Sequence, residues 1–248
     1  MTPLRAQSTS SEEIGLKIAQ DSRSLEKGFS NFTAQLSMVL KNKRGQESRR
    51  QLRVKVLEVP EDGDKSLFVF DEPRDIQGTA LLIHAHKEAP DDQWIFLPAM
   101  KRVKRISSSN QSGSFMGSEF TYEDLTPQEV EKYTYRYLRD DPCGELTCTV
   151  TERFPLDKKS GYRRQLIWHD RDKLRAWKVQ FYDRKDFHLK TLTLENYELY
   201  NDRFWYAGKM TMENHLTGKS TQLTRSDYEI DGDVNEKEFT STGLKRVR

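Results

Sequence analysis

Short runs of alternating apolar and polar residues recur along most of this chain, and they constrain its fold more than any other feature. The clearest run places five apolar side chains on one face of an extended segment: Phe32, Ala34, Leu36, Met38 and Leu40. Turn residues such as Asp62-Gly63-Asp64 and Thr217-Gly218 separate neighbouring runs. We count about ten to twelve strands joined as antiparallel hairpins, which predicts one large sheet that must curl or close to protect its edges.

Helices are predicted at only a few places. Ser10 and Glu13 have the spacing of a capping box and Gly28 is a stop signal, which together indicate a helix over residues 11–27. A short second helix is predicted at 126–129, where a Thr cap and a Pro at the first helical position coincide. No repeat or linker composition divides the chain. We therefore predict a single domain over 1–248, with 1–10 as a disordered remnant of a signal or of cloning.

The longest break in the strand pattern covers residues 94–125. It leaves an apolar strand end, passes through a basic run at 101–105, and then places Phe115 and Met116 between two glycines. A loop of this length in a compact domain is usually functional or disordered. We predict that it lays Phe115 and Met116 across the open sheet as part of a lid, with the polar residues 107–112 as its least rigid part.

The charge of the chain gives no reason to expect a nucleic acid partner. Lysine and arginine number 41 and aspartate and glutamate 39, for a net charge of +2. The basic run at 101–105 offers charges to phosphates, but it lacks the interleaved aromatic residues that stack on single-stranded bases. A solvated surface is the favoured interpretation. No apolar run reaches the roughly 18 residues of a membrane-spanning helix.

Enzyme chemistry and metal binding are not predicted. The sequence contains no phosphate loop, nucleophile elbow or metalloprotease helix motif. His84 and His86 share a strand face, but nothing nominates further ligands for a metal, and no cofactor site is indicated. A lipid hydrolase is a weaker alternative, because it would need one of the five histidines to meet a serine and an acid at a pocket mouth.

Two cysteines, Cys143 and Cys148, flank a predicted turn. They are candidates for a disulfide in an oxidising compartment, and in a reducing one they would be ordinary thiols. The residues alone leave both alternatives open.

Residues Trp94–Ile106 and Gly113–Leu125 resemble the signature of a periplasmic family, the outer-membrane lipoprotein-sorting or LolA-like proteins, in the branch associated with lipid-exporting efflux transporters. Residues 70–81 and a late hairpin at 209–221 are similar to further parts of the family pattern. The resemblance implies a half-closed antiparallel β-barrel with an N-terminal helix and a loop or helix lid over an apolar cavity. It also implies export to the periplasm, with the signal peptide absent from this sequence.

On this resemblance we expect a carrier or chaperone that binds the acyl chains of a lipid or lipoprotein for transfer towards the outer membrane. An inner-membrane transporter and an outer-membrane acceptor are the expected partners. Nine apolar residues are candidates for the cavity and its lid: Phe32, Leu36, Met38, Trp94, Phe96, Phe115, Met116, Trp177 and Phe181. Arg102 and Arg105 are candidates for contact with a head group or a partner. The alternative is a non-enzymatic interaction module whose loop docks on an efflux-type membrane transporter and whose interior is filled.

Overall fold

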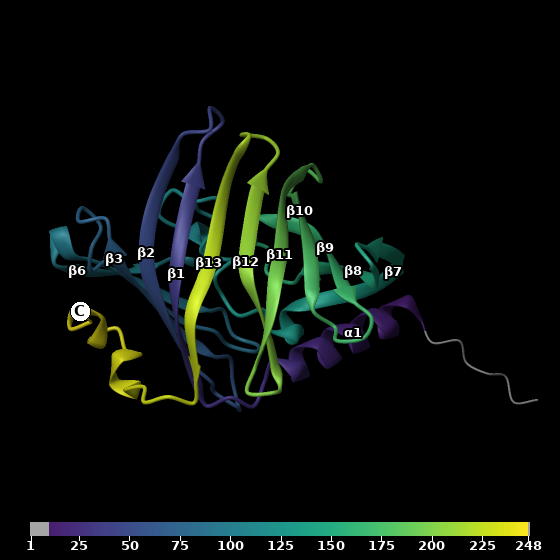
Figure 1. Cartoon of the computed structure of the whole chain (residues 1–248), viewed down its shortest axis with the longest axis horizontal. Helices are drawn as coiled ribbons and strands as arrows, with labels where there is room; N and C mark the ends of the chain where they lie inside the picture. The colour runs from purple at the N-terminus through teal and green to yellow at the C-terminus, as the bar shows by residue number, and fades with distance from the viewer. Residues whose placement is uncertain (1–9, 248) are drawn as a thin grey trace, which may run out of the picture.

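The computed structural model describes residues 10–247, so the remnant predicted at the N-terminus lies, over residues 1–9, outside the described residues. Residues 10–247 contain one α-helix, α1 (Ser11–Leu25), and thirteen strands in a single sheet (Figure 1). The strands are β1 (Asn31–Lys41), β2 (Glu47–Leu57), β3 (Lys65–Glu72), β4 (Ala80–His84), β5 (Asp92–Leu97), β6 (Arg102–Ile106), β7 (Tyr133–Cys143), β8 (Leu146–Pro155), β9 (Tyr162–Asp170), β10 (Ala176–Asp183), β11 (His188–Tyr200), β12 (Phe204–Asn214) and β13 (Lys219–Ile230). The prediction of a mainly β fold is confirmed.

The order of the strands explains why the sheet stays open. Strands β1 to β6 and strands β7 to β13 form two antiparallel meanders, which are joined where β1 pairs with β13. Consequently β6 and β7 are the two edges, and within residues 10–247 no ladder joins them. Side chains from both meanders share one buried cluster, so the sheet curls around one face, which we call the inner face. The result is a half-open barrel.

The basic run accounts for the difference between thirteen strands and the ten to twelve that we predict. Instead of belonging to a loop, Arg102–Ile106 forms the edge strand β6, with Val103 opposite Phe96 of β5. Two partly buried apolar residues, Val103 and Ile106, are enough to hold the strand, while the charged side chains between them face solvent. Charged residues on an edge strand also discourage pairing with other chains.

Helix α1 begins as predicted and ends two residues early. Ser10 accepts from the Glu13 backbone N–H while Glu13 accepts from the Ser10 N–H, which completes the capping box. The helix packs closely on β7, because a Cβ at Gly15 would lie 2.7 Å from the backbone of Arg136 and Tyr137. Glycine therefore sets how near α1 can approach the sheet.

The helix predicted at 126–129 is wrong. Only a 3₁₀ turn, Val130–Lys132, follows this position, and Glu129 before it is extended, with φ −73° and ψ 138°. Thr126 does not cap a helix, because its hydroxyl accepts a hydrogen bond from Gln93 on β5 and donates to the Tyr122 carbonyl. Tertiary hydrogen bonds thus outweigh the local helix signals.

The outer face of the sheet is covered at one end by the C-terminal residues. Phe239 and Leu244 are fully buried there against Leu67 and Leu82. Figure 1 shows this segment in yellow beside β3 and β6. Because β3 and β4 are buried on both faces, their sequences are nearly continuous apolar runs.

Residues 107–128, which we call the inner segment, connect the two edges of the sheet by crossing its inner face. Phe115 is fully buried and packs on Phe68 and Phe70, with ring centroids 6.4 and 5.5 Å apart. Ser108–Asn110, in the part predicted to be least rigid, forms a 3₁₀ turn. The predicted lid therefore lies inside the half-barrel and fills a large part of it.

Candidate functional site

A cavity of about 400 Å³ remains between the inner face, α1 and the end of the inner segment. This volume falls within the range of small-molecule sites in proteins. Its floor consists of apolar side chains that alternate inward from strands of both meanders: Phe32, Leu36, Val54, Phe68, Val179, Leu194, Ala207 and Met210. Such a floor favours the burial of hydrocarbon.

The roof of the cavity comes from two separate pieces of chain. Ala19 and Ser22 of α1 contribute one side, and Leu125 to Gln128 of the inner segment contribute the other. Gln93, which is fully buried, donates to the Tyr122 carbonyl at 3.0 Å and to the Thr126 hydroxyl at 2.8 Å. The Gln93 hydrogen bonds thus hold the inner segment on β5, and α1 covers the cavity from the side opposite the inner segment.

Ion pairs of Arg23 link α1 to Glu129, directly after the inner segment, and to Asp64, directly before β3. Arg23 on α1 lies 2.9 Å from Asp64 and 2.7 Å from Glu129, and both carboxylates are buried. Burial alone would lower the pKa of Arg23, but the carboxylates of Glu26, Glu129 and Asp64 outweigh it and raise this pKa. The guanidinium therefore stays charged and holds the C-terminal half of α1 over the cavity.

A second buried ion pair holds the inner segment on the sheet. The Lys190 Nζ on β11 lies 2.6 Å from Asp124, and both side chains are almost completely buried. Tyr162 donates to the other oxygen of Asp124 at 2.7 Å, and Lys190 also donates to the Glu119 carbonyl at 3.1 Å. These contacts satisfy both charges, as burial requires.

Three further polar side chains face the cavity. His169 on β9 is 7% exposed, and burial together with the charge of Arg153 lowers its pKa to about 4, so it is neutral near pH 7. Arg153 on β8 donates to Gln165 at 2.6 Å and to Gln128 at 3.2 Å. Arg225 on β13 also lines the cavity, beside the apolar floor.

Comparisons with known proteins place this architecture in a family. A family model described as "Uncharacterized protein" matches residues 62–246. The solved structure of a domain from Vibrio parahaemolyticus, assigned to outer membrane lipoprotein sorting, is 49% identical and covers 95% of this chain and 100% of its own, with a TM-score of 0.93. The chain belongs to the family of outer membrane lipoprotein-sorting proteins.

Two other solved structures share the fold. A DUF1329 family protein from Desulfovibrio piger is 26% identical and covers 95% of this chain and 100% of its own, with a TM-score of 0.90. A LolA superfamily protein from Nitrosomonas europaea is 21% identical, covers 91% of this chain and 97% of its own, and shares the fold with a TM-score of 0.73. Curated proteins give no match. The half-open LolA-like barrel that the sequence resemblance implies is confirmed.

Across residues 10–247, no helix has both the length and the hydrophobicity that crossing a membrane requires.

Two of the nine predicted cavity residues line the cavity, namely Phe32 and Leu36 on β1. Four others belong to the same buried cluster without lining the space: Met38 and Phe181 lie on the inner face of the sheet, and Phe115 and Met116 lie in the inner segment that packs on it. Phe115 and Met116 therefore do not line the cavity in this structure. The reason is that the inner segment fills one part of the half-barrel, and the cavity is what it leaves open.

Three predicted cavity residues lie on the outer face. Because Gln93 points inward to bind the inner segment, Trp94 and Phe96 alternate outward and pack on the cluster under the C-terminal residues. Trp177 is also turned outward, since the ladder between β9 and β10 shifts register between Ala176 and Lys178. Assigning these three residues to the cavity is wrong.

The two arginines predicted for head-group contact are not near the cavity lining either. Arg102 is exposed on the edge strand β6. Arg105, on the same strand, forms an ion pair with Asp92 of β5. Strand pairing of the basic run with β5 explains this placement, because it fixes both side chains at the edge of the sheet.

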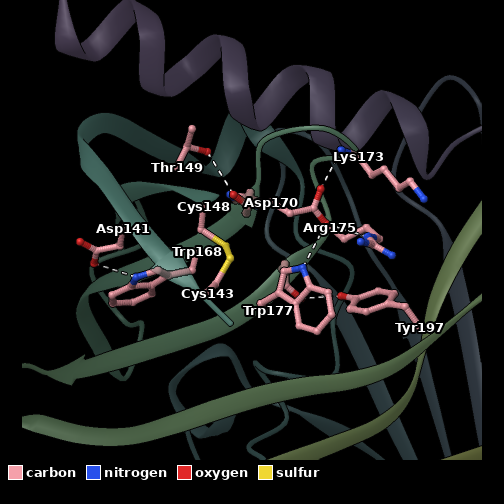
Figure 2. Close-up of a disulfide and its surroundings, with 12 residues drawn as sticks. Asp141, Cys143, Cys148, Thr149, Trp168, Asp170, Lys173, Arg175, Trp177 and Tyr197 are labelled. Carbon is pink, nitrogen blue, oxygen red and sulfur yellow. Dashed lines mark hydrogen bonds and ion pairs between the residues drawn. A yellow bond between two sulfur atoms is a disulfide. The ribbon is translucent and has the colours of Figure 1, made fainter. Parts of the chain in front are cut away.

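The structure contains the disulfide between Cys143 and Cys148, which joins β7 to β8 across their turn with a Cα–Cα distance of 5.8 Å (Figure 2). Two indoles flank it on the outer face: Trp168 donates to Asp141 and Trp177 donates to Asp170, each at 3.0 Å. This cluster explains what Trp177 does instead of lining the cavity. The disulfide and the two indoles stabilise the end of the sheet against which α1 packs.

The sequence analysis missed the ionisable residues of the site. Thr221 and Leu223 are buried, and Arg225 follows them at the same spacing of two residues. The alternation of the strand alone would therefore have placed Arg225 on the inner face. His169 follows Ile167 in the same way on β9. A charged or polar residue at an inward position of an apolar strand is the signal that could have found both. The ion pairs of Arg23 have no such signal, because they join residues far apart in sequence.

Proposed function

We propose that this protein is a periplasmic carrier that binds the acyl chains of a lipid or lipoprotein in the cavity for transfer towards the outer membrane. The observation that carries the proposal is the apolar cavity of about 400 Å³ inside a half-barrel of the lipoprotein-sorting family. Each buried methylene contributes about 0.8 kcal/mol, so a single acyl chain binds appreciably in a preformed apolar site. No catalytic group is needed for this role.

Release of the ligand would require the roof to open. The roof is made of two pieces, and α1 is connected to the inner-segment side through the Arg23 ion pairs with Asp64 and Glu129. We propose that an inner-membrane transporter loads the carrier and that an outer-membrane acceptor unloads it by competing for these contacts. The open cavity supports a carrier over an interaction module with a filled interior.

Acyl-chain binding can be tested with a variant that fills the cavity. Ala207→Trp places an indole on the cavity floor, and Leu199→Trp adds the same side chain at an exposed position of β11. Native mass spectrometry after gentle purification should detect one bound lipid, and palmitic acid should displace a fluorescent fatty acid from the wild type and from Leu199→Trp. Ala207→Trp should lose this binding while remaining folded by circular dichroism. The absence of both co-purifying lipid and saturable binding would refute the proposal.

A further inference from the structure

Buried polar atoms without hydrogen-bond partners are concentrated at the cavity. Within residues 10–247, eight buried side-chain nitrogen or oxygen atoms have no partner. Four of them belong to residues that line the cavity: Arg23 Nε, His169 Nδ1, Tyr206 Oη and Arg225 Nε. Folded proteins leave few buried polar atoms unpaired, so a group of them at one site needs an explanation.

The charged groups around the cavity are paired unevenly, because Arg23 binds three carboxylates, Glu26, Asp64 and Glu129, while two arginines of the lining bind none within residues 10–247. Three arginines and two carboxylates contribute to the lining: Arg23, Arg153, Arg225, Glu26 and Asp64. Both carboxylates are taken by Arg23, at 3.5 Å for Glu26 and 2.9 Å for Asp64. Neither of the other two arginines forms an ion pair within the part of the chain that the structure describes. A positive charge is therefore left facing an apolar space.

Arg225 is the better placed of these two arginines to meet a ligand. Arg153 already donates to two glutamines, whereas Arg225 makes no side-chain hydrogen bond within residues 10–247. Arg225 stands opposite Leu36 of β1, which also lines the cavity. An arginine cannot escape an apolar environment by losing its proton, so it requires an anionic or strongly polar partner.

Two tyrosines accompany Arg225. The ring of Tyr228 lies 4.7 Å from that of Tyr206 and 4.9 Å from that of Phe32, in stacked arrangements. Both tyrosine hydroxyls are buried without a partner. Burial raises the pKa of each tyrosine, the Glu26 carboxylate raises it further and the Arg225 charge opposes both effects, while Tyr206 lines the cavity together with Arg225. The hydroxyls add two neutral donors next to the positive charge.

We propose that the cavity selects acyl ligands whose head group is an anion, a carboxylate or a phosphate, and that Arg225 binds this anion with help from the Tyr206 and Tyr228 hydroxyls. Guanidinium groups bind carboxylate and phosphate oxygens through two parallel hydrogen bonds. The apolar floor then takes the hydrocarbon chain. This inference rests on the proposed function, because it specifies the ligand of the same cavity.

Three ligands with the same sixteen-carbon chain test the inference: palmitic acid, hexadecyl phosphate and hexadecanol. Each is titrated at pH 7.5 against the full chain loaded with an uncharged fluorescent reporter, N-phenyl-1-naphthylamine. We expect at least one of the two anions to bind about 10-fold or more tightly than the alcohol, since a charge-assisted hydrogen bond is lost with the uncharged head group. Which anion binds better identifies the source of the charge.

Variants of Arg225 separate head-group recognition from chain binding. Arg225→Gln should bring the anion to within about threefold of the alcohol, and Arg225→Lys should keep part of the preference because it keeps the charge. Arg163→Gln, at an exposed position of β9, is the matched control and should change nothing. If Arg225→Gln does not fold, the titrations of the wild type with the three ligands still test the preference for an anionic head group.

The possible failures are distinguishable. If all three ligands bind the wild type equally, the head-group inference is wrong and acyl-chain binding stands. If Arg225→Gln keeps the full preference for the anion, Arg225 is not the group that binds it. If none of the three displaces the reporter, the proposed function fails as well.

Discussion

Ionisable residues around the cavity fall into two groups that differ in their partners. Arg23 and Lys190 each lie within 3 Å of a buried carboxylate, so their charges stabilise contacts between distant segments. Arg225 and His169 have buried nitrogen atoms without partners and face the apolar space. The first group holds α1 and the inner segment in place, and the second is available to a ligand. Substitution of Lys190 should therefore change stability, and substitution of Arg225 should change ligand binding.

Acidification should destabilise the protein through His169. Burial lowers the pKa of His169 to about 4, so between pH 6.5 and pH 4 the unfolded chain binds a proton that the folded chain excludes. The free energy of unfolding should fall by about 2 kcal/mol from pH 7.5 to pH 5 because of this residue. Urea unfolding of the wild type and of His169→Gln at both pH values checks this. The variant should lose less stability, and an equal loss in both proteins would show that His169 is not responsible.

Removal of Lys190 should leave Asp124 buried without its ion-pair partner. Lys190→Met is expected to lower the free energy of unfolding by about 3–5 kcal/mol. Lys17→Met is the control, because it breaks an exposed pair with Asp21 on α1 and should cost less than about 0.5 kcal/mol. Urea unfolding measures both variants. A loss for Lys190→Met as small as that of the control would contradict the anchoring role.

Among the elements, α1 and the inner segment matter most, because together they form the roof. The inner segment is bound to β5 through Gln93 and to β11 through Lys190. Helix α1 instead touches the sheet by close backbone packing at Gly15 and by the ion pairs of Arg23. Gly15 is the one residue of α1 that is buried. The helix is therefore the part of the roof that we expect to open.

Enlarging Gly15 should push α1 away from β7. The added methyl group of Gly15→Ala would lie 2.7 Å from backbone atoms that cannot move aside, so a loss of about 1–3 kcal/mol is expected despite the better helix propensity of alanine. Gln20→Ala, at an exposed position of the same helix, should be neutral or slightly stabilising. Hydrogen exchange should be faster over α1 in the first variant only. Unchanged exchange and stability would mean that the contact at Gly15 is not tight in solution.

The sequence predicts the helix and the strands better than it predicts on which face of the sheet each side chain lies. The capping box at Ser10 and the alternation of β1 depend on neighbouring residues, and both are found where expected. The alternating pattern shows which side chains share a face of the sheet. It does not show whether that face is the inner or the outer one, or which segment packs on it. Trp94 and Phe96 look like cavity residues for this reason, although the distant residues Phe239 and Leu244 bury them from the outside.

At the scale of the whole molecule, the cavity is a consequence of topology. A thirteen-stranded sheet built from two meanders has two edges that do not meet within residues 10–247, so the connection between β6 and β7 must cross the space between them. Here it crosses on the inside and buries Phe115 in the middle of the half-barrel. The remaining space is closed by α1. Phe115 and Met116 predict that the loop lies across the open sheet, but no local pattern indicates that it fills the inside of the half-barrel instead of covering it as a lid.

Locating a bound acyl chain tests this view of the molecule most directly. A palmitic acid analogue with a diazirine at the end of its chain is irradiated with the full chain, and the labelled residues are identified by peptide mass spectrometry. We predict labels on the cavity floor, at residues such as Leu36, Leu194 and Met210, which excess palmitic acid removes. Labels confined to the outer face around Trp94 or Trp177, or the absence of any label that palmitic acid displaces, would contradict it.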